Sequence, residues 1–162
     1  MGIQFTPEIE AQFKSLLPRY PNKLAALIPT LYLAQEQFGY LRPEVMEYVA
    51  QRLDLPASQV LNTATFYTML HKKPVGRYHI EVCTNVSCYL RGCDDVLEAL
   101  QKKLSIECGE TTADGLFTLD EVQCLAACGT APVMCVNRIY RENLTPDEAV
   151  KIVDGLNKST KP

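Results

Sequence analysis

The spacing of apolar residues changes character about halfway along the chain. Up to about residue 70, apolar positions recur every three or four residues, which is typical of amphipathic helices. From Tyr78 onward they alternate with polar positions in short runs, which is typical of strands. Between the two patterns, residues 72–77 combine proline, glycine and charge, as linkers do. The sequence therefore predicts two domains, residues 1–75 and residues 76–162.

The first two helices are marked by residues that start and stop helices. Thr6 followed by Pro7 is a helix start, because threonine caps helices well and proline suits the first helical position. A second helix is expected to begin near Asn22 or Lys23 and to end at Gly39. Pro29 falls inside that second pattern and predicts a kink there.

Two more helices complete the first half. Pro43 opens a helix that stops at Leu55-Pro56, and residues 57–70 begin as a fourth. The β-branched and aromatic end of this fourth helix is expected to loosen into a loop. Short connections favour a small bundle. No group of residues in this predicted bundle indicates a catalytic site. His71 is expected in a surface loop.

The second half predicts strands and helices in alternation. Tyr78, Ile80 and Val82 would share one face of a strand, and His79 with Glu81 the solvent face. The remaining predicted elements are a helix at 94–104, strands at 117–122 and 132–137 with a possible continuation at 138–140, a helix at 145–156, and a frayed tail at 158–162. This order predicts an α+β chain in which the helical bundle is followed by an α/β domain close to a thioredoxin-like arrangement.

Composition narrows the classes of function. The chain is 47% hydrophobic and 22% charged, which is ordinary for a globular protein. Its net charge of −3 and the lack of a basic block argue against nucleic-acid binding. No apolar run approaches a membrane span, and the start of the sequence does not read as a signal peptide. The seven cysteines are therefore expected in a reducing compartment, where paired cysteines more often hold metal than form disulfides.

Four of the cysteines form two close pairs, C-x4-C and C-x3-C, and each pair follows a predicted strand. Two loops that each supply two sulfurs can build a thiolate cage, and a [2Fe–2S] cluster takes four thiolates. The spacing matches neither the plant-type nor the bacterial ferredoxin run, so a structural zinc site stays open as the weaker alternative. The predicted ligands are Cys83, Cys88, Cys124 and Cys128. Cys93, Cys108 and Cys135 are expected to remain unligated, with Cys135 a small core residue.

Several motifs in combination resemble one family. They are Cys83-Thr-Asn-x-x-Cys88-x-Leu-Arg-Gly92, Phe117-Thr-Leu, and Cys124-Leu-x-x-Cys128-Gly-x-Ala-Pro132, with Gln35-x-x-x-Gly39-Tyr40 and Ala64-Thr-Phe-Tyr-Thr-Met69 in the first half. This pattern resembles the [2Fe–2S] subunit of respiratory NADH:quinone oxidoreductase, complex I, over about residues 20–155. Two departures are visible, since the family often has Glu where this chain has Gln123 and Gly where it has Ala126.

The resemblance implies a fold, a cofactor and a partner. It implies a helical bundle followed by a thioredoxin-like domain that holds one [2Fe–2S] cluster through the four paired cysteines. The cluster would exchange single electrons with the FMN of a partner flavoprotein subunit, which would also bind NADH. The chain would thus be a subunit of an oxidoreductase, not catalytic alone, in contact with other peripheral-arm subunits on the cytoplasmic side of the cell membrane.

Three other interpretations compete with this one. The same domain could serve as the diaphorase subunit of an NAD-linked hydrogenase or formate dehydrogenase. A free-standing dimeric [2Fe–2S] ferredoxin would have no use for the helical first half. A zinc-stabilised interaction module would have no redox role.

Overall fold

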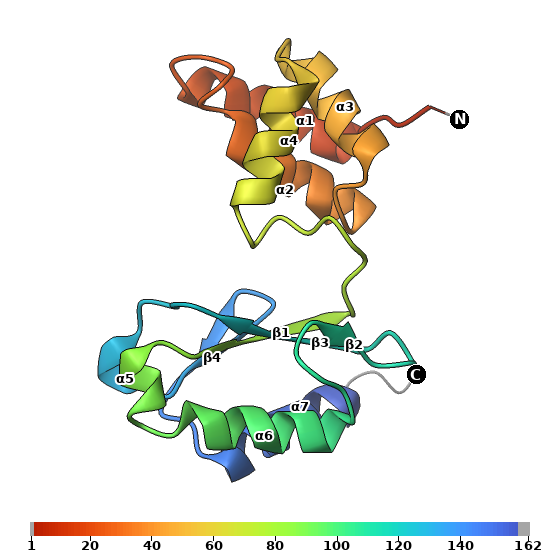
Figure 1. Ribbon diagram of the computed structural model, residues 1–162. Coiled ribbons are helices and arrows are strands. Elements are labelled where there is room, and N and C mark those ends of the chain that lie inside the picture. The colour runs from red at the N-terminus through yellow and green to blue at the C-terminus, as the bar shows by residue number, and fades with distance from the viewer. Residues whose placement is uncertain (1, 159–162) are drawn as a thin grey trace. The chain divides into compact units, whose positions relative to one another are not determined.

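The computed structural model describes residues 2–158 and divides into two compact units, Met1–Pro74 and Val75–Pro162 (Figure 1). Helices make up the first unit, and a sheet with helices makes up the second, so the predicted α+β class is confirmed. The tail that we predicted from residue 158 lies, from residue 159 on, outside the described residues. Lys158 itself is the last residue of the final helix.

The helical unit is built from four α-helices and one short 3-10 turn. Thr6 caps the first helix as predicted, because its Oγ1 accepts the N–H of Ile9 at 3.4 Å. The apolar sides of the helices meet in one core, in which Leu27, Leu31 and Val49 are almost fully buried. The elements are α1 (Pro7–Leu16), η1 (Leu17–Arg19), α2 (Leu27–Phe38), α3 (Pro43–Leu53) and α4 (Ala57–Phe66).

Helix α2 begins later than the sequence pattern predicts. The side chain of Asn22 accepts the N–H of Ala25 at 2.9 Å, and this bond holds the preceding segment in a turn. The helix then starts at Leu27, so Pro29 lies in its first turn. N–H groups of the first turn have no partner within a helix, so proline disrupts nothing there. The predicted start at Asn22 or Lys23 is wrong for this reason, and the predicted kink at Pro29 loses its cause.

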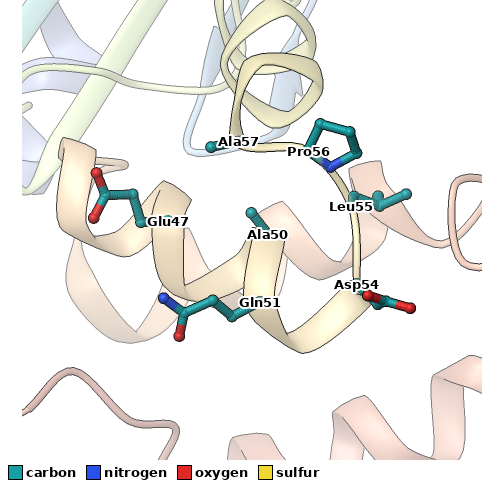
Figure 2. Close-up of a pocket in the computed structure, with 7 residues that line it drawn as sticks. All are labelled: Glu47, Ala50, Gln51, Asp54, Leu55, Pro56 and Ala57. Atoms are coloured by element: carbon teal, nitrogen blue, oxygen red, sulfur yellow. The ribbon is translucent and has the colours of Figure 1, made fainter.

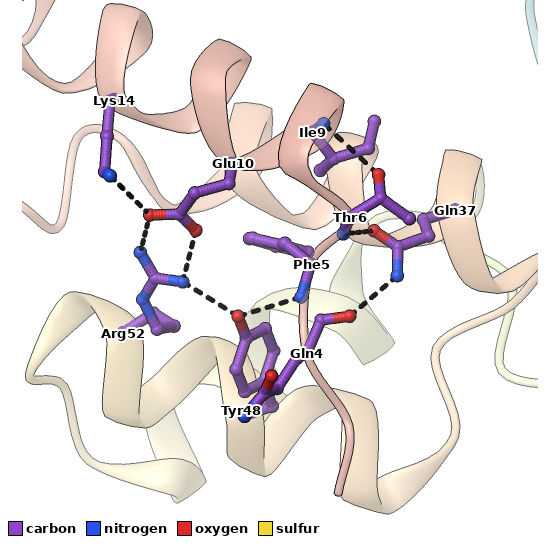
Figure 3. A network of polar contacts seen from close by, with 9 residues as sticks. All are labelled: Gln4, Phe5, Thr6, Ile9, Glu10, Lys14, Gln37, Tyr48 and Arg52. Atoms are coloured by element: carbon purple, nitrogen blue, oxygen red, sulfur yellow. Dashed lines mark hydrogen bonds and ion pairs between the residues drawn. The ribbon is translucent and has the colours of Figure 1, made fainter. Parts of the chain in front are cut away.

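A polar network ties the N-terminal segment and α1 to α3 (Figure 3). The guanidinium of Arg52 donates two hydrogen bonds to the carboxylate of Glu10, at 2.6 and 2.8 Å, and a third to the hydroxyl of Tyr48 at 2.8 Å. That hydroxyl also accepts the N–H of Phe5 at 3.1 Å. The bonds from Arg52 hold the pKa of Glu10 below its usual range. The network therefore fixes the chain before α1 against the body of the unit.

The end of the helical unit loosens as the sequence predicts. Helix α4 stops at Phe66, and Tyr67 adopts an extended conformation. His71 is half-buried, and its N–H donates to the side chain of Gln35 at 2.6 Å. A surface pocket lies where α3 meets α4 (Figure 2), and Glu47 lines it among other residues. None of its lining residues is a cysteine or a histidine, so this pocket is not the site that the sequence predicts.

The second unit is a five-stranded sheet in the order β2-β3-β1-β4-β5. Strands β1 and β3 are parallel neighbours, and the other pairs are antiparallel. Helices α6 and α7 lie together on one face of the sheet (Figure 1) and cover its apolar residues. The elements are β1 (Tyr78–Cys83), α5 (Val86–Tyr89), α6 (Cys93–Leu104), β2 (Glu110–Thr111), β3 (Phe117–Val122), η2 (Cys128–Thr130), β4 (Met134–Val136), β5 (Ile139–Arg141) and α7 (Pro146–Lys158).

The chain enters this sheet through a close approach at Gly76. Its N–H donates to the hydroxyl of Thr118 at 2.6 Å. A Cβ at Gly76 would lie 2.7 Å from the backbone carbon of Phe117, closer than such atoms can approach. Only glycine therefore lets this segment run against β3.

His79 departs from its predicted place on the solvent face of β1. It is buried, with 8% of its surface exposed, and its Nε2 lies 2.6 Å from Oδ2 of Asp120 on β3. The parallel register places His79 beside Thr118, which is also buried. Alternation along a strand could not show that a carboxylate from the neighbouring strand would make burial of the imidazole possible.

Candidate metal centre

The parallel pair of strands brings the two cysteine pairs to one end of the sheet. Cys83 is the last residue of β1 and lies opposite Val122, the last residue of β3. Cys124 follows two residues later in the chain. The backbone closes this end, since Cys83 donates its N–H to the carbonyl of Val133 at 3.1 Å and Thr84 donates to Val122 at 3.0 Å. Figure 1 shows α5 at the same end, directly after β1.

A short helix that the sequence did not reveal positions Cys88. Asn85 caps α5, with its side chain accepting the N–H of Val86 at 2.8 Å and its carbonyl accepting the N–H of Tyr89 at 2.8 Å. Cys88 points inward and is 1% exposed. A helix of four residues is too short for an apolar period to form, so the only sequence signal was the capping asparagine.

The sulfurs of the first pair interact with each other and with the second pair. Burial raises the pKa of the Cys83 thiol, but hydrogen bonds from the backbone N–H groups of Asn85 and Leu125, and from neighbouring sulfurs, bring it below its usual value. Burial and the adjacent Cys83 raise the pKa of Cys88 to about 11. Cys88 and Cys124 contribute to lowering the pKa of Cys83, and Cys128 contributes to raising that of Cys88. The two cysteine pairs therefore lie near each other at this end of the sheet.

The second loop holds its cysteines differently. Cys124 and Cys128 are both exposed. The N–H of Ala126 donates to Sγ of Cys124 at 3.3 Å, and Ala126 adopts a left-handed conformation with φ of 58° to do so. This is the position where the family often has glycine, a residue that adopts such a conformation without strain. An N–H aimed at sulfur stabilises a thiolate and, through it, a bound metal.

Arg91 joins the two loops. Its Nε donates to the carbonyl of Ala131 at 2.6 Å, across forty residues of sequence. Arg91 lies three residues after Cys88, and Ala131 lies three residues after Cys128, so the bond crosses just beyond the second cysteine of each pair. The bond between Ala131 and Pro132 is cis. No sequence pattern indicated this contact, because the two residues approach each other only in the folded sheet.

The three remaining cysteines differ in their distance from the site. Cys93 is fully buried and packs in one apolar cluster with Cys83 and Cys88. Burial raises the pKa of Cys93 to about 11. Cys135 is 4% exposed within β4, and Cys108 is half-buried after α6. Burial raises the pKa of both thiols.

The donor set suits an iron–sulfur cluster. Four cysteine sulfurs, with backbone N–H groups directed at three of them, form the soft, hydrogen-bonded environment that such clusters need. Among residues 2–158, no three His, Cys, Asp or Glu side chains are arranged to hold a single metal ion. The role of these cysteines as ligands stays a prediction.

Within the described part of the chain, no helix has both the length and the apolar character to cross a membrane.

Comparison with known proteins agrees with the sequence and the site. A subunit of the NADH-quinone oxidoreductase of Rickettsia conorii is 46% identical, over 88% of this chain and 87% of the relative. The corresponding subunit from Mycobacterium bovis is 39% identical over 94% of this chain, which spans 60% of that longer relative.

A solved structure shares the fold, and a family model covers most of the chain. A chain of an NAD+-reducing [NiFe]-hydrogenase matches 84% of this chain with a TM-score of 0.73 and 20% identity, although this chain spans only 23% of it. The model for thioredoxin-like [2Fe–2S] ferredoxins matches residues 13–157. The chain therefore belongs to the thioredoxin-like [2Fe–2S] ferredoxin family.

Proposed function

We propose that this chain is the electron-transfer subunit of an NADH:quinone oxidoreductase. It binds one [2Fe–2S] cluster and exchanges single electrons with the FMN of a partner flavoprotein subunit during NADH oxidation. The observation that carries the proposal is the parallel register of β1 and β3, which brings Cys83 and the start of the second cysteine loop to one end of the sheet. The chain is also 46% identical to an NADH-quinone oxidoreductase subunit. The chain is part of an oxidoreductase complex and is not catalytic alone.

The residues at the site have distinct tasks. The four paired cysteines are the ligands, and the N–H groups of Asn85, Leu125 and Ala126 donate to their sulfurs and offset negative charge. The bound cluster supplies the ability to take up and release one electron at a time. Burial of Cys83 and Cys88 keeps water from the inner side of the site, while exposure of Cys124 and Cys128 leaves the outer side open to a partner.

The NADH and FMN sites belong to the partner. The sequence contains no G-x-G-x-x-G run, so no nucleotide cradle of that kind is present. In the complex, this chain sits in the peripheral arm on the cytoplasmic side of the cell membrane and contacts the flavoprotein subunit and other arm subunits.

Co-expression with a flavoprotein subunit tests the proposal. The purified complex, reduced anaerobically with NADH, is expected to give the EPR signal of a reduced [2Fe–2S] cluster. The Cys128→Ala variant should lose the signal. The control Cys135→Ala should keep it, because Cys135 lies in β4 away from the gathered sulfurs. A colourless protein that contains zinc and no acid-labile sulfide would contradict the proposal and support the zinc module.

The same preparation separates the two redox alternatives. A diaphorase subunit of a hydrogenase or formate dehydrogenase would present the same cluster domain, and the hydrogenase match in fold is consistent with either assignment. The subunits that co-purify from the source organism decide between them. Quinone-reducing subunits support the proposal, and a hydrogenase or formate dehydrogenase module supports the alternative.

A further inference from the structure

A polar pair lies between the two strands that lead to the cysteine loops. Nε2 of His79 on β1 is 2.6 Å from Oδ2 of Asp120 on β3. His79 is buried, whereas the side chain of Asp120 is 37% exposed. An ionised carboxylate only accepts hydrogen bonds, so the imidazole donates from Nε2, and this bond forms whether or not the ring is charged.

The two residues of this pair hold matching positions along the chain. His79 lies four residues before Cys83, and Asp120 lies four residues before Cys124. Residues an even number apart in a strand point to the same face, so His79 shares its face of β1 with Cys83. Strands β1 and β3 stay paired from His79 as far as Cys83 and Val122. The pair therefore links the two strands shortly before each reaches its first cysteine.

The alternation of apolar residues does not by itself fix the register of these strands. Ile80 on β1 and Leu119 on β3 belong to the core that α6 and α7 cover. A slip by one residue would turn both away from this core, but a slip by two would return each strand to the same face. Such a slip would move one cysteine loop past the other by about 7 Å, which is two residues of strand length.

The pair of His79 and Asp120 opposes a slip by two residues, because the buried imidazole would then lose its acceptor. Contacts at the far end of the strands act in the same sense, since Tyr78 stacks on Phe117 with ring centroids 5.5 Å apart. The polar pair lies closer to the cysteines than this stack. An apolar side chain in place of a buried polar pair often costs no stability, and register is the best-attested reason for such a pair.

We propose that His79 and Asp120 are positioning residues for the cluster, which hold the two cysteine loops level with each other. This inference rests on the proposed function and names residues that keep its predicted ligands in place. Loss of the bond should loosen the cluster more than it destabilises the chain, because the apolar core of the sheet unit does not depend on it.

Variants of the full chain, co-expressed with the flavoprotein subunit, test the inference. His79→Leu should release iron to a chelator roughly tenfold faster, because it removes a hydrogen bond to a carboxylate. It should also broaden the EPR signal of the reduced cluster, since the ligands would no longer hold a single arrangement. The urea midpoint of the metal-free His79→Leu chain should stay close to that of the unmodified chain. His79→Gln should release iron within about threefold of the unmodified rate, because its amide can still donate to Asp120.

Two further variants and a matched control show whether the pair acts as a unit. Asp120→Ala should release iron as fast as His79→Leu, and the double variant should be no faster, because the two residues make one interaction. The control is Thr111→Val, which removes a 2.7 Å hydrogen bond between the hydroxyls of Thr111 and Thr118 on β2 and β3. Strand β2 leads to neither cysteine loop, so this variant should release iron within about twofold of the unmodified rate.

The outcomes separate the two proposals. An unmodified rate and an unmodified EPR signal in His79→Leu overturn the inference and leave the proposed function intact. Faster release in Thr111→Val, or additive effects in the double variant, overturn it as well. A fall in the urea midpoint of metal-free His79→Leu that matches the faster release also overturns it, since general destabilisation would then explain the loss. If the unmodified complex gives no [2Fe–2S] signal, the proposed function itself fails.

Discussion

Each of the two cysteine loops contributes two cysteines to the predicted site, but the first loop buries its cysteines and the second leaves them exposed. The first loop leaves a central strand and folds at once into α5, which buries Cys83 and Cys88. The second loop leaves β3, carries a non-glycine residue in a left-handed conformation, and leaves Cys124 and Cys128 exposed. Thus one half of the site is formed by the packing of the chain, and the other half stands open. The difference shows that the first loop holds its two cysteines by packing, whereas the second leaves its two accessible to solvent.

The largest expected difference between the loops is in the chemical reactivity of their thiols. In the metal-free chain at pH 8, iodoacetamide should modify Cys124 and Cys128 at least about 100-fold faster than Cys88, because alkylation needs an accessible thiolate. Cys88 is buried, and its pKa is raised to about 11. A raised pKa favours the protonated thiol, so only roughly a thousandth of Cys88 is thiolate at pH 8. Mass spectrometry of peptides over a time course gives the rates.

The pH dependence and the unfolded chain provide the controls. Reaction at Cys88 should grow as the pH rises toward 11, since the thiolate fraction grows with it. Cys93, which is fully buried with a pKa of about 11, should follow Cys88. In strong denaturant the four paired cysteines should react at similar rates. Equal rates in the folded chain would contradict the contrast between a closed and an open loop.

Removal of the hydrogen bond between Arg91 and Ala131, which joins the two loops, should have the next largest effect. The Arg91→Ala variant removes a charge-assisted hydrogen bond of 2.6 Å and leaves the buried carbonyl of Ala131 without its donor. The free energy of unfolding of the sheet unit should fall by about 2 kcal/mol. The second loop should also release iron to a chelator several times faster than in the unmodified chain. Urea unfolding and the decay of the visible spectrum measure the two effects.

An arginine elsewhere on the same sheet is the matched control. Arg141 is exposed on the edge strand β5, and Arg141→Ala should change the free energy of unfolding by no more than about 0.5 kcal/mol. If both variants behave alike, Arg91 does not join the loops in solution. Arg91→Lys keeps the charge but not the planar donor, so it should recover only part of the loss.

The sequence predicted what is local and missed what depends on the fold. The caps, the strand pattern and the cysteine pairs lie within a few residues of each other, and the predicted elements at 78–82 and 117–122 are present in the structure. The burial of His79 and the Arg91 bond depend on groups that are far away in the sequence. The start of α2 depends on a local bond between Asn22 and Ala25, which the apolar period does not reveal. Helix α5 was missed because four residues carry no period. At the site, the spacing of the cysteines predicted which four belong together. It did not predict that the first pair is buried and the second pair exposed.

The smallest expected effect concerns the strain in the second loop, and it has a predicted sign. Ala126 has a left-handed backbone conformation, with φ of 58°. Ala126→Gly therefore relieves about 1 to 2 kcal/mol of steric strain in the folded state. It also stabilises the unfolded state by a somewhat smaller free energy, because glycine gives the unfolded chain more conformational entropy. The net gain in stability should be about 0.5 kcal/mol, seen as a higher urea midpoint, and the N–H bond to Cys124 should persist. The neighbouring Ala127 has a negative φ of −109°, so Ala127→Gly should instead destabilise the chain by about 0.5 to 1 kcal/mol. Two adjacent alanines that respond with the same sign would show that the loop does not hold this strained conformation. Opposite signs would show that the open loop carries strain to keep an N–H group on the sulfur of Cys124.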